Sequence, residues 1–209
     1  MRIYKKLFSC LALFLLCIVC LLTDVPKVWA AEFLTADDGT FLYMNRRELA
    51  ISDDEDGVKF FLADDGTLQL MNKNTQDVYK TFVPLEQGMV DYRVRDFFTA
   101  NPENIFFEIN ATIGAHAQNC GYWLIGKENG QWVTYVTLED LAKNGYAIDQ
   151  WRQIVTKINT DGSGRFILLS QYEYMPPEAT FGMQRKYCTD LQLELLWDDA
   201  APGFVMRRL

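Results

Sequence analysis

Residues 63–72 read ADDGTLQLMN and indicate a β fold. An Asp-Gly pair between two apolar runs is a strong signal for a β-hairpin. Residues 36–45 read ADDGTFLYMN and match that stretch at seven of ten positions, with a period of 27 residues. Phe33-Leu34 and Phe61-Leu62 precede the two copies. Each copy therefore predicts a strand, an Asp-Asp-Gly turn and a second strand.

Alternating apolar and charged residues continue the β pattern after the two copies. Val90, Tyr92 and Val94 alternate with charged residues that include Arg93 and Arg95. This period of two is typical of a strand with one buried face. We expect the apolar side of this strand to face a core and the charged side to face solvent.

The rest of the chain predicts further hairpins and one short helix. Asn129-Gly130 lies between two apolar runs and favours a two-residue turn. Thr137 is a suitable N-cap, and Gly145 a suitable end, for a helix near residues 138–144. Residues 154–158 are rich in β-branched side chains, which favours a strand. We therefore predict a mainly β protein of antiparallel meanders and hairpins, arranged as a sandwich or as propeller-like blades.

The first thirty residues have the anatomy of a secretory signal peptide. A basic start with Arg2, Lys5 and Lys6 precedes an apolar run at residues 7–22, and small residues lead to Ala30. The apolar run is shorter than the roughly 20 residues of a membrane-spanning helix, and an uncleaved anchor is the alternative. We expect cleavage after residue 30 and a secreted or periplasmic protein of the cell envelope.

The charge balance argues against nucleic acid as a partner. The chain has 20 basic and 28 acidic residues and a formal net charge of -8. Removal of residues 1–30 takes away four basic residues and one acidic residue, and changes the net charge to -11. Phosphate binding needs a basic surface. We also expect contact with a membrane only through the signal peptide.

Beyond the signal peptide we expect hairpin repeats over residues 31–86 and a β-rich unit over residues 87–209, in the same or an adjoining domain. The second unit contains a loose duplication. The same order of elements occurs twice, once around Cys120 and once around Cys188. Each time a strand is followed by a connection with one cysteine, a second strand, a turn and a third strand. In an oxidising compartment these two cysteines predict one disulfide bond, and two unpaired buried thiols are the alternative.

The sequence NTDGSG, residues 159–164, is the best candidate metal site. Asn159, Asp161 and Ser163 place oxygen atoms at alternate positions, with glycine at the sixth, as calcium loops do. This loop and the apolar strand after it resemble the FG-GAP-type repeats of extracellular β-propellers, and the resemblance covers residues 90–209. It implies calcium as a cofactor. Ser163 stands where such repeats usually have Asp, and no later carboxylate completes the shell. We therefore prefer an ordinary hairpin turn without a cofactor.

Other candidate residues indicate binding rather than catalysis. Exposed aromatic side chains can anchor a partner, and the candidate contact loop consists of Tyr174, Met175, Pro176 and Pro177. His116 lies close to Cys120 in the sequence, but a cysteine in an exported chain is more simply oxidised than catalytic. No catalytic residues are therefore assigned.

These observations predict an exported, non-catalytic protein that binds a protein or carbohydrate partner or has a structural role. The alternative is a secreted hydrolase that uses two carboxylates on a polysaccharide, because the many acidic residues allow many pairings.

Overall fold

The computed structural model describes residues 33–34, 40–42, 46–51, 57–101, 103–114, 118–146, 152–159, 162–174 and 186–209. Over these ranges the chain is mainly β, with antiparallel strands and one short helix, as the sequence predicts. Residues 33–209 form one compact unit. The predicted signal peptide lies outside the described residues.

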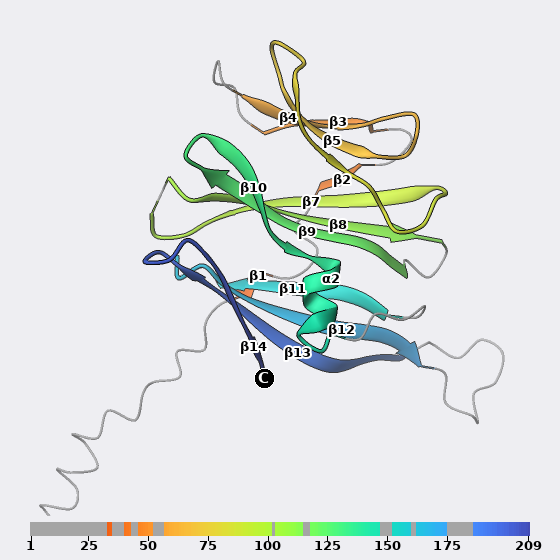
Figure 1. Cartoon of the computed structure of the whole chain (residues 1–209). Helices are drawn as coiled ribbons and strands as arrows, with labels where there is room; N and C mark the ends of the chain where they lie inside the picture. The colour runs from red at the N-terminus through yellow and green to blue at the C-terminus, as the bar shows by residue number, and fades with distance from the viewer. Residues whose placement is uncertain are drawn as a thin grey trace, which may run out of the picture. The chain divides into compact units, whose positions relative to one another are not determined.

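The described strands form three antiparallel sheets (Figure 1). The N-terminal sheet has the order β3 (Glu48–Ala50), β4 (Val58–Leu62), β5 (Leu68–Asn72), β6 (Val78–Phe82). The central sheet has the order β10 (Gln131–Thr137), β9 (Gln118–Glu128), β8 (Ile105–Ile113), β7 (Val90–Phe98), β2 (Thr40–Leu42). The C-terminal sheet has the order β1 (Phe33–Leu34), β11 (Arg152–Asn159), β12 (Arg165–Tyr174), β13 (Lys186–Asp198), β14 (Gly203–Arg208). Each sheet is therefore built on a meander of four consecutive strands.

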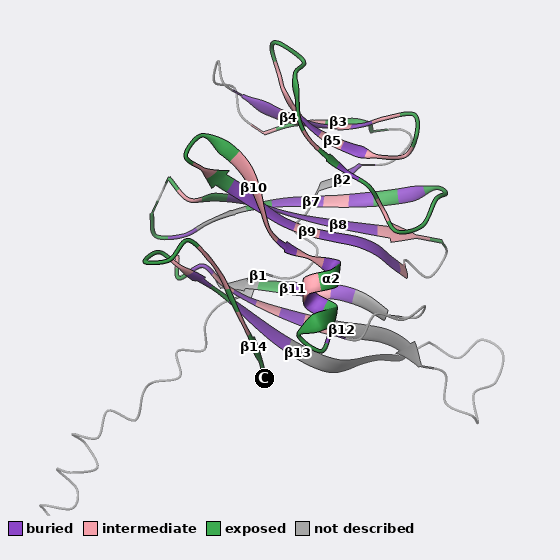
Figure 2. Ribbon diagram, viewed as in Figure 1, coloured by how far each residue is buried: buried purple, intermediate pink, exposed green. Residues whose placement is uncertain are grey.

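Two hydrophobic cores lie on opposite faces of the central sheet. Phe60 and Leu70 of the N-terminal sheet pack with Ile109 of the central sheet in the first core. Phe106 of the central sheet and Phe166 of the C-terminal sheet belong to the second core. Buried residues accordingly follow strands β8 and β9 along most of their length (Figure 2). The central sheet is thus covered on both faces.

This double coverage corrects the prediction for strand β7. Val90, Tyr92 and Val94 face the first core, as the alternation predicts. Arg95 was expected on a solvent face, but it is only 4% exposed. The reason is that the C-terminal sheet covers the other side of the central sheet, and the alternation of one strand does not show what packs against its polar side.

The second copy of the repeat forms the predicted hairpin. Strands β4 and β5 pair antiparallel on either side of the Asp-Asp-Gly turn. Asp65 Oδ1 accepts a hydrogen bond of 2.9 Å from the backbone N–H of Thr67. Gly66 has a φ of 84°, a conformation that glycine adopts without steric cost. The turn is therefore fixed by interactions within four residues.

For the first copy, the hairpin prediction is wrong. Strand β1 pairs with β11 of the C-terminal sheet, whereas β2 pairs with β7 of the central sheet. The two strands are short and each covers the edge of a longer strand. Leu42 at the end of β2 is fully buried in the first core. Burial and edge pairing at distant strands outweigh the local turn signal.

The predicted helix and the predicted Asn-Gly turn are both confirmed. Helix α2 spans Leu138–Lys143 and has Thr137 as its N-cap. Thr137 and Asp140 form a reciprocal capping box, and Gly145, with a φ of 89°, lies two residues past the end. Asn129 and Gly130 have positive φ values of 49° and 80° and connect β9 to β10. No helix in the described part of the chain is long and apolar enough to span a membrane.

Candidate functional site

A groove lies where strand β9 extends beyond its neighbour β10. Strand β9 begins at Gln118, but the register of β10 on β9 ends at the pair Thr137 and Trp123. Beside the overhanging end, the backbone N–H of Leu85 donates to the carbonyl oxygen of Cys120 at 2.7 Å. Helix α2 starts directly after β10. The overhang is therefore flanked by the β6–β7 connection and by the helix.

The groove contains a cavity of about 450 Å³. Its walls come from three segments, which contribute Val83 and Leu85, then Cys120, Gly121, Tyr122 and Trp123, and finally Thr137, Leu138, Glu139 and Ala142. Ligand pockets have volumes of roughly 300–1,000 Å³ and mainly apolar walls with a few polar groups. The cavity matches this description in both size and lining.

The rim of the groove exposes large apolar side chains. Val83 and Leu85, which line the cavity, are 65% and 74% exposed, and Met89, further along the same β6–β7 connection, is 72% exposed. Single apolar residues on a surface are ordinary, but an apolar cluster next to a cavity is typical of a binding surface. The rim therefore extends the apolar surface of the cavity outward.

The floor of the groove depends on a glycine. A Cβ atom on Gly121 would lie 2.2 Å from Cη2 of Trp123, a distance that no real contact allows. The absent side chain lets the indole lie over the strand, where it also packs on Phe82 with ring centroids 5.4 Å apart. The position of the Trp123 ring at the groove is thus fixed from two sides.

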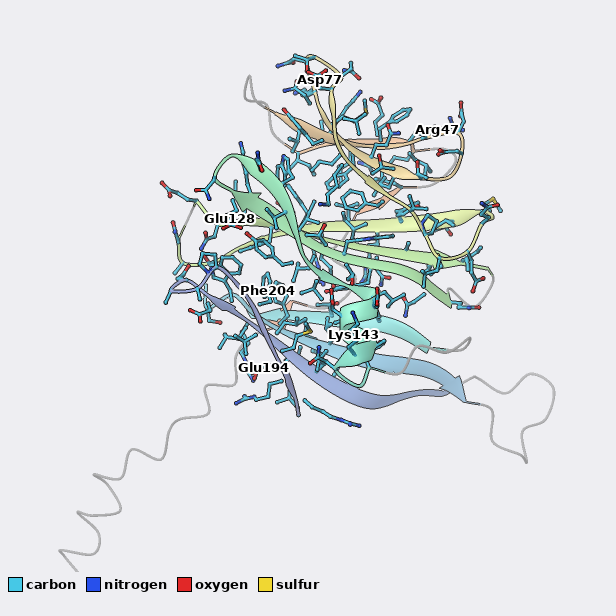
Figure 3. The ribbon with its side chains drawn as sticks, in the orientation of Figure 1. Arg47, Asp77, Glu128, Lys143, Glu194 and Phe204 are labelled. Atoms are coloured by element: carbon cyan, nitrogen blue, oxygen red, sulfur yellow. The ribbon has the colours of Figure 1, made fainter. Side chains whose placement is uncertain are left out.

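Carboxylates give the groove a negative surrounding. Glu139 is a lining residue at the start of α2, and it forms an exposed ion pair of 3.1 Å with Lys143, which Figure 3 labels on the helix. Glu86 accepts a hydrogen bond of 3.0 Å from Gln118 Nε2 at the start of β9. The lining residues include no lysine, arginine or histidine. The site is therefore apolar at its centre, with the Glu139–Lys143 ion pair at one edge and the Glu86 carboxylate at another.

Cys120 is a free buried thiol, and the predicted disulfide bond to Cys188 is wrong. The Cys120 side chain belongs to the core between the N-terminal and central sheets. Cys188 lies on β13 of the C-terminal sheet, on the other side of the central sheet. Both are the third residue of their strand, whereas the sequence pattern places each in a connection before a strand, and the two strands belong to different sheets.

The Cys120 thiol is also held in its protonated form. Burial, and then the negative charge of Glu86, raise its pKa to about 11. A thiol is nucleophilic only as the thiolate. Cys120 therefore contributes a small apolar surface to the groove at neutral pH.

A second set of polar residues is buried between the central and C-terminal sheets. Arg95 Nε donates to Glu108 Oε2 at 3.1 Å, and the Thr156 hydroxyl of β11 donates to the other carboxylate oxygen. Asn110 Nδ2 donates to the backbone oxygen of Ile154, also in β11, at 3.3 Å. The bonds to Thr156 and Ile154 connect β8 of the central sheet to the C-terminal sheet, whereas the Arg95–Glu108 bond connects β7 and β8 within the central sheet.

The charges of this cluster have opposing effects on two titratable groups. Burial alone would raise the pKa of Glu108, but Arg95 and Arg93 lower it, as do hydrogen bonds from Thr156 and Arg95. The net pKa of Glu108 is below its ordinary value. Burial and then the charge of Glu108 raise the pKa of Tyr122 well above its ordinary value. At neutral pH the Glu108 carboxylate therefore stays ionised and the Tyr122 hydroxyl stays protonated.

The lowered pKa of Glu108 predicts a loss of stability in acid. The group stabilises the fold fully above its pKa in the unfolded chain, and this contribution is lost as the pH falls through the folded pKa. Urea unfolding between about pH 6 and about pH 3 should show a falling free energy of unfolding. A Glu108→Gln variant should lose part of this slope. An unchanged slope in the variant would show that Glu108 has its ordinary pKa in the folded state.

The described residues include two of the three calcium candidates. Asn159 is the last residue of β11, Ser163 lies in the exposed turn before β12, and Asp161 lies outside the described residues. The carbonyl oxygen of Gly162 accepts a hydrogen bond from the backbone N–H of Ala100. This turn connects two antiparallel strands, β11 and β12. Within the described ranges, no group of three metal-ligating side chains occurs.

The other candidate residues fall mostly outside the described structure. Tyr174 ends strand β12, whereas Met175, Pro176 and Pro177 lie outside the described residues. The same holds for His116, so its relation to Cys120 is not described.

The groove itself was not predicted from the sequence, although Cys120 in its wall was singled out for a different reason. One available signal is Gly121, because a glycine inside a strand often marks a close approach of another group. A second is the occurrence of Val83, Leu85 and Met89 in one short connection. Comparisons of the chain with protein-family models, with curated proteins and with solved structures gave no match.

Proposed function

We propose that this protein is exported and acts as a non-catalytic binding protein, with the groove beside the end of β9 as its binding site. The observation that carries the proposal is the cavity of about 450 Å³ with an apolar lining and an exposed apolar rim. Removal of such surface from water is favourable by about 25 cal/mol per Å². A partner that inserts an apolar group would cover both the cavity and the rim.

The chemistry of the groove and of the buried Arg95–Glu108 cluster supports binding over catalysis. The Cys120 thiol is protonated at neutral pH because its pKa is raised to about 11. The Glu108 carboxylate is 1% exposed and paired with Arg95. A buried carboxylate that is held ionised by arginine does not fit the role of a general acid. Export is supported by the basic and apolar pattern of residues 1–30.

The proposal is tested by titrating the purified protein with the neutral apolar dye N-phenyl-1-naphthylamine. Its fluorescence should rise and saturate as the dye enters the cavity. Leu85→Asp at the rim and Ala142→Trp at the helix wall should each weaken dye binding by about tenfold or more, because one adds a charge and the other fills space. Quenching of Trp123 provides a second readout.

Val205→Asp is the matched control, since Val205 is 56% exposed on β14 and away from the lining of the groove. This variant should bind the dye as the unmodified protein does. Dye binding that is equally strong in the Leu85, Ala142 and Val205 variants would contradict the proposed site.

A further inference from the structure

A second cavity lies next to the groove along the same chain segment. It has a volume of about 260 Å³, and its lining includes Met89 and the turn residues Asp64 and Asp65. Leu85 at the rim of the groove and Met89 are four residues apart, so their Cα atoms are at most about 14 Å apart. The exposed apolar residues of the β6–β7 connection therefore lie between the two cavities. One extended polypeptide of about six residues is long enough to contact both.

Both cavities have an acidic character. Glu86 lies beside the groove and is hydrogen-bonded to Gln118, whereas Glu139 of the lining is paired with Lys143. In the second cavity, Asp64 pairs with Arg47, labelled in Figure 3, whereas Asp65 is exposed and accepts hydrogen bonds from Thr67. The second cavity thus has one negative charge in excess. An occupant with positive charges would be complementary to both.

We infer that the partner is an extended basic polypeptide segment, with an apolar side chain in the groove and a lysine or arginine a few residues away beside Asp65. This inference rests on the proposed function of the groove. Trp123 lines the groove, where the apolar side chain of such a segment would insert. A second copy of this chain is a poor occupant, because its net charge is -8 and like charges repel.

Two matched six-residue peptides test the inference. One has phenylalanine near one end and two lysines near the other, and its control has glutamates in place of the lysines. A fluorescent label on each peptide allows binding to be measured by anisotropy, and displacement of N-phenyl-1-naphthylamine shows entry into the groove. The basic peptide should bind at least about tenfold more tightly than the acidic one, and added salt should reduce this difference.

The double variant Asp65→Asn with Glu86→Gln removes two carboxylates with little change of shape. It should weaken binding of the basic peptide by about fivefold, since exposed ion pairs each contribute modestly. The dye titration on the same variant reports whether the cavity is intact. Glu103→Gln is the control, because Glu103 is an exposed residue that lines neither cavity.

The outcomes separate this inference from the proposal on which it rests. Tighter binding of the basic peptide that the double variant weakens would support the inference. Equal binding of both peptides, or tighter binding of the acidic one, would overturn it. If the dye binds and neither peptide displaces it, the inference fails while the groove remains a binding site. If the dye does not bind, both the proposed function and the inference fail.

Discussion

Replacing Glu108 by glutamine is expected to lower the free energy of unfolding by about 3–5 kcal/mol, because the change leaves a buried arginine without its counter-charge. Glu108 and Arg95 are 1% and 4% exposed, so solvent does not compensate for the loss. The hydrogen bond from Thr156 ties the same carboxylate to the C-terminal sheet. Equilibrium unfolding in urea, followed by tryptophan fluorescence, measures the effect.

Two control variants compare Glu108→Gln with an apolar replacement of the buried pair and with the loss of an exposed ion pair. Arg95→Met combined with Glu108→Leu replaces the buried pair by apolar side chains and should recover most of the lost stability. Glu48→Gln breaks the exposed ion pair with Lys59, which has an N–O distance of 3.1 Å, and should cost less than about 1 kcal/mol. A result in which Glu108→Gln lowers the free energy of unfolding no more than Glu48→Gln does would show that the Glu108 carboxylate is hydrated. It would also contradict the described packing of the central sheet on the C-terminal sheet.

Replacing Phe106 by alanine is expected to cost about 3–5 kcal/mol, which is typical of a buried phenylalanine. The ring lies on the central sheet with centroid distances of 4.6 Å to Trp197, 5.2 Å to Phe204 and 6.0 Å to Tyr135. Figure 3 labels Phe204 on β14. Removal of this ring leaves a cavity and breaks several aromatic contacts between the two sheets. Urea unfolding gives the energy, and near-ultraviolet circular dichroism reports the loss of fixed aromatic packing.

Phe61→Ala is the matched control for Phe106→Ala. Phe61 lies on β4 in the N-terminal sheet, is only partly buried, and has the Lys59 ammonium 5.7 Å from its ring centroid. Its removal should cost clearly less than the removal of Phe106, because much of its surface already contacts water. A similar cost for both variants would contradict the placement of Phe106 at the centre of the second core.

The sequence predicts the parts of the fold that depend on neighbouring residues. Asn129-Gly130 specifies its turn through its own backbone conformation, and Thr137 caps α2 through a partner three residues away. The pairing of β1 and β2 depends instead on which distant edges are free. The burial of Arg95 likewise depends on the stacking of a second sheet, which the residues of β7 do not encode by themselves.

The candidate site was harder to predict for the same reason. Its walls come from the β6–β7 connection, the start of β9 and the start of α2, which are separated in the sequence. Two cysteines in an oxidising compartment favour a disulfide bond, but the bond depends on the face of the sheet to which each side chain points. Cys120 points into the first core, and that direction follows from the packing of the N-terminal sheet.

Strand β1 pairs with a strand that is made much later. Phe33 pairs with Asn159, and Leu34 pairs with Ile158, so the first strand of the described chain waits for a partner that the ribosome makes much later. Contacts between residues so far apart in sequence form slowly. The C-terminal sheet reaches its full width only after β14 has emerged. Strand β1 therefore remains without its partner strand for most of the synthesis of the chain.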